Sequence, residues 1–369
     1  MIDPALGEDP EGVRAGIEDA LKAHLAEERK LYGSIGGRDA AVLADAVESI
    51  LERGKRLRPS FCYWSYRAHG GEQGTREAAG VLRVGAALEL FQAAALFHDD
   101  VMDSSDTRRG RPTAHRSFAA RHAREGWTGD AGRFGESAAI LLGDLALTAS
   151  ESQFASALAA FADGPAAAAR RVFDLMRTEV TVGQYLDVLA QALPWGVDPA
   201  ADEARAREVV RAKSARYSVE HPVALGAALA GADEAALATA REFGLPLGEA
   251  FQLRDDMLGV FGDPGVTGKP AGDDLREGKR TVLVARAMSL APPPERELLA
   301  SLLGNPDLGE DDVERLATVL EGCGAASEVE SLIDELTARA LEQLDAANLG
   351  EPGAAMLRRL ARAAVDRAA

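Results

Sequence analysis

The chain has 369 residues, of which 47% are hydrophobic, so it is long enough to bury a large core. Its formal net charge of −18 argues against non-specific nucleic-acid binding, and its two cysteines, Cys62 and Cys323, indicate neither a disulfide framework nor a zinc site. The N-terminus lacks the order of a signal peptide, and no uncharged apolar run reaches the roughly 18 residues of a membrane span, so we expect a cytoplasmic protein.

Nearly every segment has helical periodicity and a helix-favouring composition, so we predict helices and no sheet. The predicted helices span residues 13–32, 39–52, 56–68, 75–103, 114–123, 135–161, 166–191, 200–213, 214–230, 234–262, 277–291, 294–303, 311–321, 325–346 and 352–368. The breaks between them are short and rich in turn residues, apart from two longer loops at 125–135 and 262–279. Because no stretch has the composition of a linker, we expect residues 1–369 to form one all-α domain, a single helical bundle, with residues 1–12 as a disordered tail.

The first candidate site lies where the predicted helix 75–103 turns from apolar to acidic, at Asp99, Asp100 and Asp103. Asp99 and Asp103 lie one turn apart on one face of that helix, about 6 Å along its axis. Paired carboxylates on an otherwise buried helix are costly to desolvate unless a cation compensates them. Oxygen ligands that leave room for water and phosphate suit Mg²⁺, so this pattern predicts a magnesium site.

A second pair, Asp255 and Asp256, ends the apolar part of the predicted helix 234–262 in the same way. The pairs 273–274 and 311–312 are expected to lie in loops and to be solvated, as most such pairs are in a chain with 59 acidic residues. The alternative for the first of these pairs is that Asp273 and Asp274 approach the site on a mobile loop. Two acidic sites on helices, with arginines nearby, predict a pocket for a metal-bridged diphosphate.

Two basic segments run against the acidic background of the chain. The sequence GKRLRP at 54–59 places Lys55 and Arg58 at the start of a predicted helix, where the helix dipole also favours anions. Arg108 and Arg109 follow the first aspartates, and two consecutive guanidinium groups can each bind a different phosphate. The alternative for both segments is a solvated run of surface charge.

Lys213, Ser214 and Lys269 are weaker signals, because single lysines are usually solvated. The segment around Lys269 superficially resembles a nucleotide-binding loop, but the spacing of that motif is absent, Pro270 follows the lysine and no strand precedes it. The sequence also offers no Ser/His/Asp or Cys/His nucleophile set. The chemistry is therefore expected to come from a metal and the substrate.

Taken together, these residues resemble the trans-prenyl diphosphate synthases, the polyprenyl synthetase family, over about residues 40–290. The resemblance rests on DDVMDSSDTRRGRP at 99–112, GKRLRP at 54–59, KS at 213–214 and QLRDDMLGVFGDPGVTGKPAGDDLREGK at 252–279. One position departs from the pattern. The second motif reads DDxxD in many relatives, and its last position here is Gly259. We still expect Asp255 and Asp256 to hold one metal, with an extra water.

The resemblance implies an all-α bundle around a deep central cavity, a homodimer, and head-to-tail condensation of isopentenyl diphosphate with an allylic diphosphate. It implies three Mg²⁺ ions, two held by Asp99 and Asp103 and a third by Asp255, with Asp100 and Asp256 in the same metal sites. The residues implied to bind the allylic diphosphate are Arg108, Lys213, Gln252 and Lys269. Those implied to bind isopentenyl diphosphate are Lys55, Arg58, Gln92 and Arg109, and Ser214 and Lys279 are further substrate-binding residues. The released pyrophosphate is implied to accept the final proton.

The resemblance also predicts the product length. In relatives that stop at fifteen carbons, an aromatic residue often stands four or five positions before the first aspartate, where this chain has Ala95 and Ala94. Phe91 comes three residues earlier, about 4.5 Å further along the helix, which is close to one isoprene unit. We therefore expect the twenty-carbon geranylgeranyl diphosphate. If Phe91 only packs against a neighbouring helix, a longer chain becomes the better prediction, and a farnesyl product is the other alternative.

Two different activities remain as alternatives. A terpene cyclase shares the all-α fold and an aspartate-rich motif, but it would not need GKRLRP and the paired arginines to bind a second diphosphate. A non-catalytic subunit of a heteromeric synthase commonly lacks the aspartates, which this chain keeps.

Overall fold

The computed structural model describes residues 9–52, 54–262 and 272–366. The elements are α1 (Val13–Leu51), α2 (Leu57–Ala68), α3 (Arg76–Met102), β1 (Thr107–Arg108), β2 (Arg111–Pro112), α4 (Ala114–Arg124), α5 (Ala131–Leu158), α6 (Asp163–Ala192), α7 (Pro199–Val209), the π-helix η1 (Val210–Glu220), α8 (His221–Leu229), α9 (Glu234–Phe261), α11 (Asp273–Glu277), α12 (Val282–Leu290), α13 (Pro293–Leu302), α14 (Glu310–Gly322), α15 (Ala325–Ala346) and α16 (Gly353–Val365). The predicted all-α fold is confirmed.

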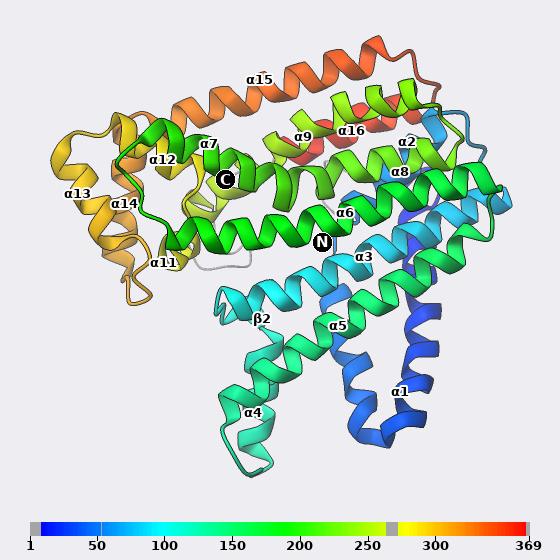
Figure 1. Ribbon diagram of the computed structural model, residues 1–369, viewed down its shortest axis with the longest axis horizontal. Coiled ribbons are helices and arrows are strands. Elements are labelled where there is room, and N and C mark those ends of the chain that lie inside the picture. Colours follow the sequence, from blue (N-terminus) through cyan, green and yellow to red (C-terminus); the bar gives the residue numbers. More distant parts are fainter. Residues whose placement is uncertain (1–8, 53, 263–271, 367–369) are drawn as a thin grey trace.

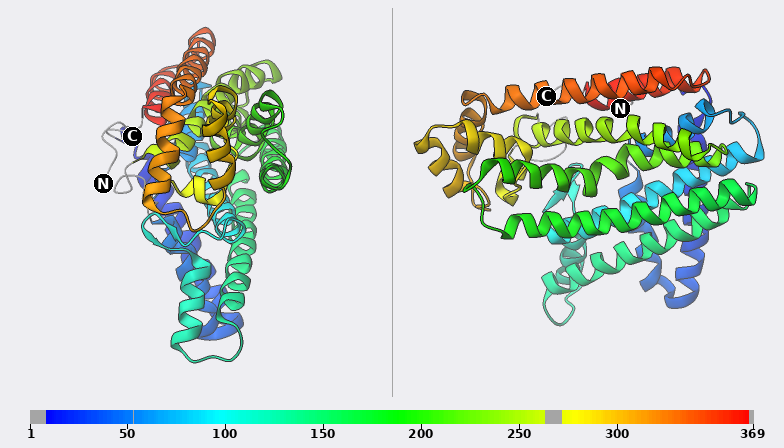
Figure 2. Two further views of the ribbon diagram at one scale, coloured as in Figure 1. Left: turned by 90° about the vertical axis from the view of Figure 1, so that its left-hand side faces the viewer. Right: turned by 45° about the horizontal axis from the view of Figure 1, so that its top comes forward.

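The long helices lie roughly side by side, from α15 at one edge through α9, α6 and α3 to α5 at the other (Figures 1 and 2). Among the pairs that pack most extensively are α3 with α5, η1 with α9, and α9 with α15. The middle of α1 and the helix α4 extend beyond this layer on the side of α5 (Figure 1). The ends of α3 and α9 that carry the two aspartate pairs lie toward the same side of the bundle.

Helix α3 is a core helix. It is apolar around most of its circumference, and Ala86, Leu88 and Leu90 are completely buried, as expected for a helix surrounded by others. Within the described residues it is the one helix long and apolar enough to cross a membrane, and 72% of its most apolar window is buried inside the protein. Burial against neighbouring helices accounts for its composition.

Several helices begin at side-chain caps. Thr75 accepts a hydrogen bond from the Ala78 amide at the start of α3, and Asp233 accepts one from the Ala236 amide at the start of α9. Such caps satisfy backbone amides that have no partner inside the helix. The two helices that carry the aspartate pairs therefore both have a defined start.

Several sequence-based boundaries were wrong. The predicted helices 13–32 and 39–52 form one helix, α1, which is kinked where Gly36 and Gly37 leave helical geometry. The prediction of no sheet was wrong at one point, because β1 and β2 form an antiparallel hairpin that pairs Arg108 with Arg111. The predicted loop at 125–135 is shorter, since Asp130 caps α5 by accepting from the Arg133 amide.

Two further differences concern segments near the aspartates. Residues predicted as parts of two α-helices, 200–213 and 214–230, instead contain the π-helix η1, which carries Lys213. The pairs 273–274 and 311–312 do not lie in loops but in the first turns of α11 and α14, where acidic residues are favoured by the helix dipole. Of the predicted tail, residues 9–12 are described, and Glu11 there forms an ion pair with Arg67 at 3.0 Å.

Glycines allow η1 to lie unusually close to its neighbours. A Cβ atom at Gly183 of α6 would overlap the backbone of Lys213, and one at Gly248 of α9 would overlap the backbone of Ala215. The absent side chains therefore bring η1 into backbone contact with a helix on each side. The π-helix is rare and is often found at functional sites. This packing sets the position from which Lys213 extends.

Candidate active site

The first aspartate motif stands at the C-terminal end of α3, where Asp99 meets a set of cationic and polar groups. Lys213 Nζ lies 2.9 Å from Asp99 Oδ1, and Arg108 Nη2 lies 3.4 Å from Asp99 Oδ2. The Gln184 side-chain amide donates to Asp99 Oδ1 at 3.2 Å. Elements far apart in the chain thus converge on one carboxylate.

Asp99 and Asp103 differ in their protonation behaviour. Burial opposes the ionisation of Asp99, but Lys213, Lys279 and Arg108 outweigh it, so its pKa lies below the usual range. Burial and the nearby charge of Asp99 instead raise the pKa of Asp103 to about 6. The two carboxylates are therefore close enough to repel each other, which a bound cation would relieve.

The hairpin β1–β2 directs the two arginines to different partners. Arg108 Nε donates to Asp100 Oδ1 at 2.6 Å, which fills one side of that buried carboxylate. Arg109 has a positive φ of 52° in the turn, and its Nη1 donates to the carbonyl of Ile50 at 3.0 Å. Because the two guanidinium groups have different partners, their arrangement is compatible with the expectation that each binds a different phosphate.

The second motif extends from the C-terminal half of α9. Asp255 is exposed, whereas Asp256 is buried and accepts a hydrogen bond from Gln252 Nε2 at 2.8 Å. The Gln252 Oε1 atom in turn accepts from the Ser214 hydroxyl. Burial, followed by the charge of Asp274, raises the pKa of Asp256 well above its ordinary value. Asp256 is therefore poorly placed to offer an ionised oxygen to the site.

At Gly259, the position that departs from the family pattern, another carboxylate fills the space. A Cβ atom at Gly259 would overlap the carboxylate of Asp274, and the Gly272 amide donates to the Gly259 carbonyl at 3.1 Å. The side chain of Asp274 is only 13% exposed. The expectation that Asp274 is solvated was therefore wrong, and it stands beside the second motif.

Lys279 joins the two motifs. Its Nζ lies 3.4 Å from Asp103 Oδ2, 3.3 Å from Asp274 Oδ1 and 2.5 Å from Glu277 Oε2. Glu277 also accepts a hydrogen bond from Ser105 at 2.8 Å, so α11 is connected to the loop after α3. Lys279 was predicted as a substrate-binding residue, and it lies between the carboxylates of both motifs.

The residues predicted to bind the second diphosphate lie around the start of α2 and along α3. Arg58 donates to Ser218 Oγ at 2.9 Å, and its guanidinium lies 4.2 Å from the centre of the Tyr217 ring. Lys55 is exposed, and Gln92 lies two turns before Asp99 on α3. Lys269 lies outside the described residues.

One of the residues predicted to limit the product length, Phe91, contacts η1. The Phe91 ring lies 5.5 Å from the Tyr217 ring, edge to face at 71°, and both side chains are buried. Ala94 is buried one turn closer to Asp99, and Ala95 is partly buried beside it. An obstacle at Phe91 therefore consists of two aromatic rings, one of which the sequence did not suggest.

Sequence reasoning missed three residues of this site, Gln184, Asp187 and Glu277, whereas it offered Asp274 as an alternative. Asp187 Oδ2 lies 2.7 Å from Lys213 Nζ, opposite Asp99. Gln184 and Asp187 are three positions apart on α6, so they lie on one face of that helix. The only sequence signal for their role was that this polar pair interrupts an otherwise apolar stripe. Nothing local in the sequence connects Glu277 with Ser105.

The donor set fits a magnesium ion that also binds phosphate. Asp103 Oδ2 and Glu277 Oε2 are buried atoms with no hydrogen-bond partner, and both are carboxylate oxygens. Within residues 9–52, 54–262 and 272–366, no three acidic, histidine or cysteine side chains form a group that could hold a metal by themselves. Mg²⁺ is usually bound through one or two carboxylates plus water and substrate phosphate, which agrees with this arrangement.

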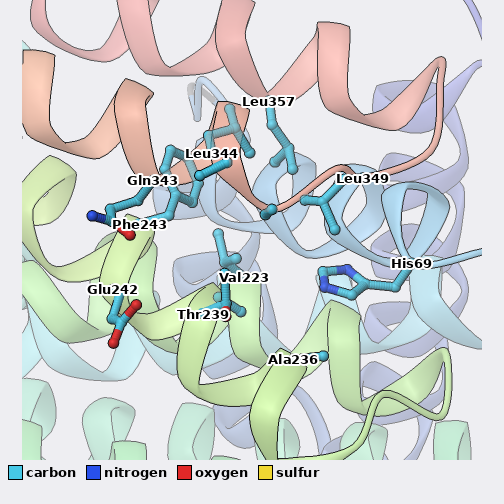
Figure 3. A pocket seen from close by; sticks show the side chains of 13 residues that line it. His69, Val223, Ala236, Thr239, Glu242, Phe243, Gln343, Leu344, Leu349 and Leu357 are labelled. Atoms are coloured by element: carbon cyan, nitrogen blue, oxygen red, sulfur yellow. The ribbon is translucent and has the colours of Figure 1, made fainter.

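Two cavities help to delimit the site. One of about 180 Å³ borders it and is lined by Ile50, Phe97, Asp100, Arg108 and Arg109, among others. Another of about 340 Å³ lies near the start of α9, between Phe243, His69 and Leu344, as Figure 3 shows. Phe243 and Asp255 are twelve residues apart on α9, about 18 Å along the axis, so this second cavity is separate from the aspartate motifs.

Comparisons with known proteins agree with this geometry. The polyprenyl synthetase family model matches residues 40–320. The geranylfarnesyl diphosphate synthase of Aeropyrum pernix is 34% identical over 287 residues, 78% of this chain and 81% of that protein. The geranylgeranyl diphosphate synthase of Mycobacterium tuberculosis is 32% identical over 303 residues, 82% of this chain and 77% of that protein.

A solved structure is similar along nearly the whole chain. It is the geranylgeranyl pyrophosphate synthase of Corynebacterium glutamicum, complexed with isoprenyl diphosphate and magnesium. It superposes with a TM-score of 0.90 at 35% identity, covering 98% of this chain and 100% of that one. The chain belongs to the polyprenyl synthetase family and is a trans-prenyl diphosphate synthase.

Proposed function

We propose that this enzyme condenses isopentenyl diphosphate head-to-tail with allylic diphosphates and releases geranylgeranyl diphosphate as its main product. The observation that carries the proposal is the convergence of two aspartate motifs and the cations Lys213, Arg108 and Lys279 on one end of the bundle. A site with this charge pattern suits a diphosphate that arrives with divalent cations.

In this proposal Asp99 and Asp103 hold two Mg²⁺ ions and Asp255 a third. When bound, these ions neutralise the leaving diphosphate and favour ionisation of the allylic carbon–oxygen bond. Asp100 is already engaged by Arg108, and Asp256 by Gln252, so both are proposed to orient the neighbours that hold the ions. Asp274 adds a carboxylate where Gly259 lacks one.

The remaining polar residues divide between the two substrates. Lys213, Arg108 and Gln252 bind the allylic diphosphate, with Ser214 fixing the orientation of Gln252. Arg58, Arg109, Lys55 and Gln92 bind isopentenyl diphosphate, whose alkene attacks the allylic carbon as the carbon–oxygen bond breaks. The attack leaves a carbocation on the former alkene, and a proton on the carbon next to it passes to the released pyrophosphate as the electrons of that C–H bond form the product's new double bond.

The geranylgeranyl product rests on the position of Phe91. Ala94 and Ala95 leave the first part of the chain path open, and the paired rings of Phe91 and Tyr217 close it one isoprene unit further along. The similar enzymes named for geranylgeranyl and geranylfarnesyl products support a chain of about this length. Farnesyl and longer polyprenyl products remain the alternatives.

We also propose a homodimer. Large apolar side chains are exposed along α5 and α6, where the surface of a monomer would be expected to be polar. They are Ile140, Leu141 and Leu147 of α5, and Leu175, Val182, Tyr185 and Val188 of α6. A second copy of the chain would bury these residues. The cytoplasmic location and the single domain over residues 1–369 stay predictions.

The decisive experiment supplies radiolabelled isopentenyl diphosphate with dimethylallyl, geranyl or farnesyl diphosphate in turn, with and without Mg²⁺. We expect Mg²⁺-dependent elongation that stops mainly at twenty carbons on product chromatography. Cyclised hydrocarbons formed without isopentenyl diphosphate would support a terpene cyclase instead. No elongation with any primer would support the non-catalytic subunit.

A further inference from the structure

The ammonium group of Lys279 occupies the centre of a carboxylate cluster that belongs to both aspartate motifs. Asp103, Asp274 and Glu277 each place an oxygen within 3.4 Å of Lys279 Nζ. The Lys279 side chain is 18% exposed, whereas those of Asp103 and Glu277 are 4% and 8% exposed. These charges are thus partly removed from water, where opposite charges attract more strongly.

The carboxylates of this cluster form ion pairs with Lys279, but not all of their oxygens accept a hydrogen bond. Asp103 Oδ2 and Glu277 Oε2, both facing Lys279, have no hydrogen-bond partner. Lys279 Nζ faces one oxygen each of Asp103, Asp274 and Glu277, so its positive charge compensates these carboxylates.

We propose that Lys279 is an internal counter-cation of this site and competes with the metal ions for the same carboxylates. This proposal rests on the proposed function, because it assumes that Asp103 holds Mg²⁺. Before a metal ion binds, Lys279 keeps the carboxylates paired and so weakens metal binding. A diphosphate offers its anionic oxygens to Lys279 instead, which frees the carboxylates. Metal and diphosphate would then bind tightly only together.

Lys213 does not share this role, although it also contacts a motif aspartate. Its Nζ has a second partner in Asp187 at 2.7 Å, which lies on α6 outside both motifs. If Asp99 turns to a metal ion, Lys213 retains that ion pair. Asp103, Asp274 and Glu277, which pair with Lys279, all lie in or beside the two motifs. If these carboxylates bind metal ions, Lys279 loses its ion pairs and its charge is available to another anion.

The test measures Mn²⁺ binding by electron paramagnetic resonance, with and without inorganic pyrophosphate, in the wild-type enzyme and three variants. Lys279→Met removes the charge and keeps much of the side-chain volume, and Lys279→Arg keeps the charge. Lys22→Met is the matched control, because it makes the same change at an exposed position on α1. Circular dichroism and the thermal midpoint establish that each variant is folded, and Lys279→Gln replaces the Met variant if it is not.

Without pyrophosphate, Lys279→Met should bind Mn²⁺ about tenfold more tightly than the wild type, because a competing positive charge is gone. The factor by which pyrophosphate strengthens Mn²⁺ binding should fall by about tenfold in the same variant, since this coupling is reciprocal between the two ligands. Lys279→Arg should bind Mn²⁺ alone no more tightly than the wild type, and Lys22→Met should match it in both conditions.

Unchanged or weaker binding of Mn²⁺ alone by Lys279→Met would overturn the competition. Tighter binding by Lys279→Arg would overturn it as well, since the charge is retained there. A different result would count against the proposed function itself: a wild-type enzyme that binds no Mn²⁺ even with pyrophosphate present would show that the aspartates do not hold metal. The failure of the inference and that of the metal site are therefore separable.

Discussion

Lys213 Nζ lies 2.9 Å from Asp99 Oδ1, although the two residues are 114 positions apart in the chain. The contact joins the end of α3 to the π-helix η1, and Asp187 of α6 holds the same ammonium from the other side. The carboxylate proposed to bind metal and the cation proposed to bind phosphate are thus held together within the fold. Such preorganisation is what stabilises charge that develops during reaction.

Replacing Asp99 or Asp103 with alanine should abolish turnover while the fold survives. Removing a carboxylate that holds a metal takes away transition-state charge stabilisation, so we expect a loss of at least about a thousandfold in kcat. Steady-state assays at saturating Mg²⁺ measure the loss, and far-UV circular dichroism checks the fold. Asp311→Ala is the control, because it alters an exposed Asp–Asp pair on α14 and should leave kcat unchanged.

The two diphosphate sites should respond to different substitutions. Arg58→Ala and Arg109→Ala should raise the KM for isopentenyl diphosphate more than that for the allylic substrate, and Lys213→Ala should do the opposite. Lys269→Ala, at a position outside the described residues, is predicted to act like Lys213→Ala. A charge-assisted contact to one phosphate does not report on the other. Equal changes in both KM values across the set would show that the division of roles is wrong.

Product length should change on either side of the Phe91–Tyr217 contact. Ala94→Phe places a ring one isoprene unit closer to Asp99 and should shorten the main product to fifteen carbons. Phe91→Ala opens the path and should give products beyond twenty carbons, although Tyr217 remains. Chromatography of dephosphorylated products from a farnesyl primer measures both. If the product of Phe91→Ala were unchanged, the floor of the path would lie elsewhere.

The close packing of η1 should make one glycine difficult to replace. Gly248→Ala places a methyl group against the backbone of Ala215, which cannot rotate away, so we expect a loss of about 1–3 kcal/mol in the free energy of unfolding. Gly164→Ala is the matched control on α6, because nothing lies within 4 Å of its added Cβ and alanine favours a helix. Urea denaturation measures both. Equal stability of the two variants would contradict the close packing of η1 between α6 and α9.

Much of the fold and of the site could be predicted from the sequence because the signals are local. Helical periodicity and caps such as Thr75 and Asp233 define where helices begin, within a few residues. The aspartate pairs on apolar helices needed no tertiary information, because burying such charges requires a cation wherever the helix packs. The fold class followed from these features, and the prenyl synthase family followed from the resemblance of the motifs to that family.

Tertiary structure alone decided which of the charged residues meet. No local pattern connects Lys213 with Asp99 and Asp187, or Lys279 with Asp103 and Glu277, because those contacts depend on how whole helices are rotated and how closely they approach. The approach depends in turn on small residues such as Gly248, whose effect is visible only against the backbone it admits. Periodicity describes which face of a helix is buried, but it does not specify which helix will cover that face.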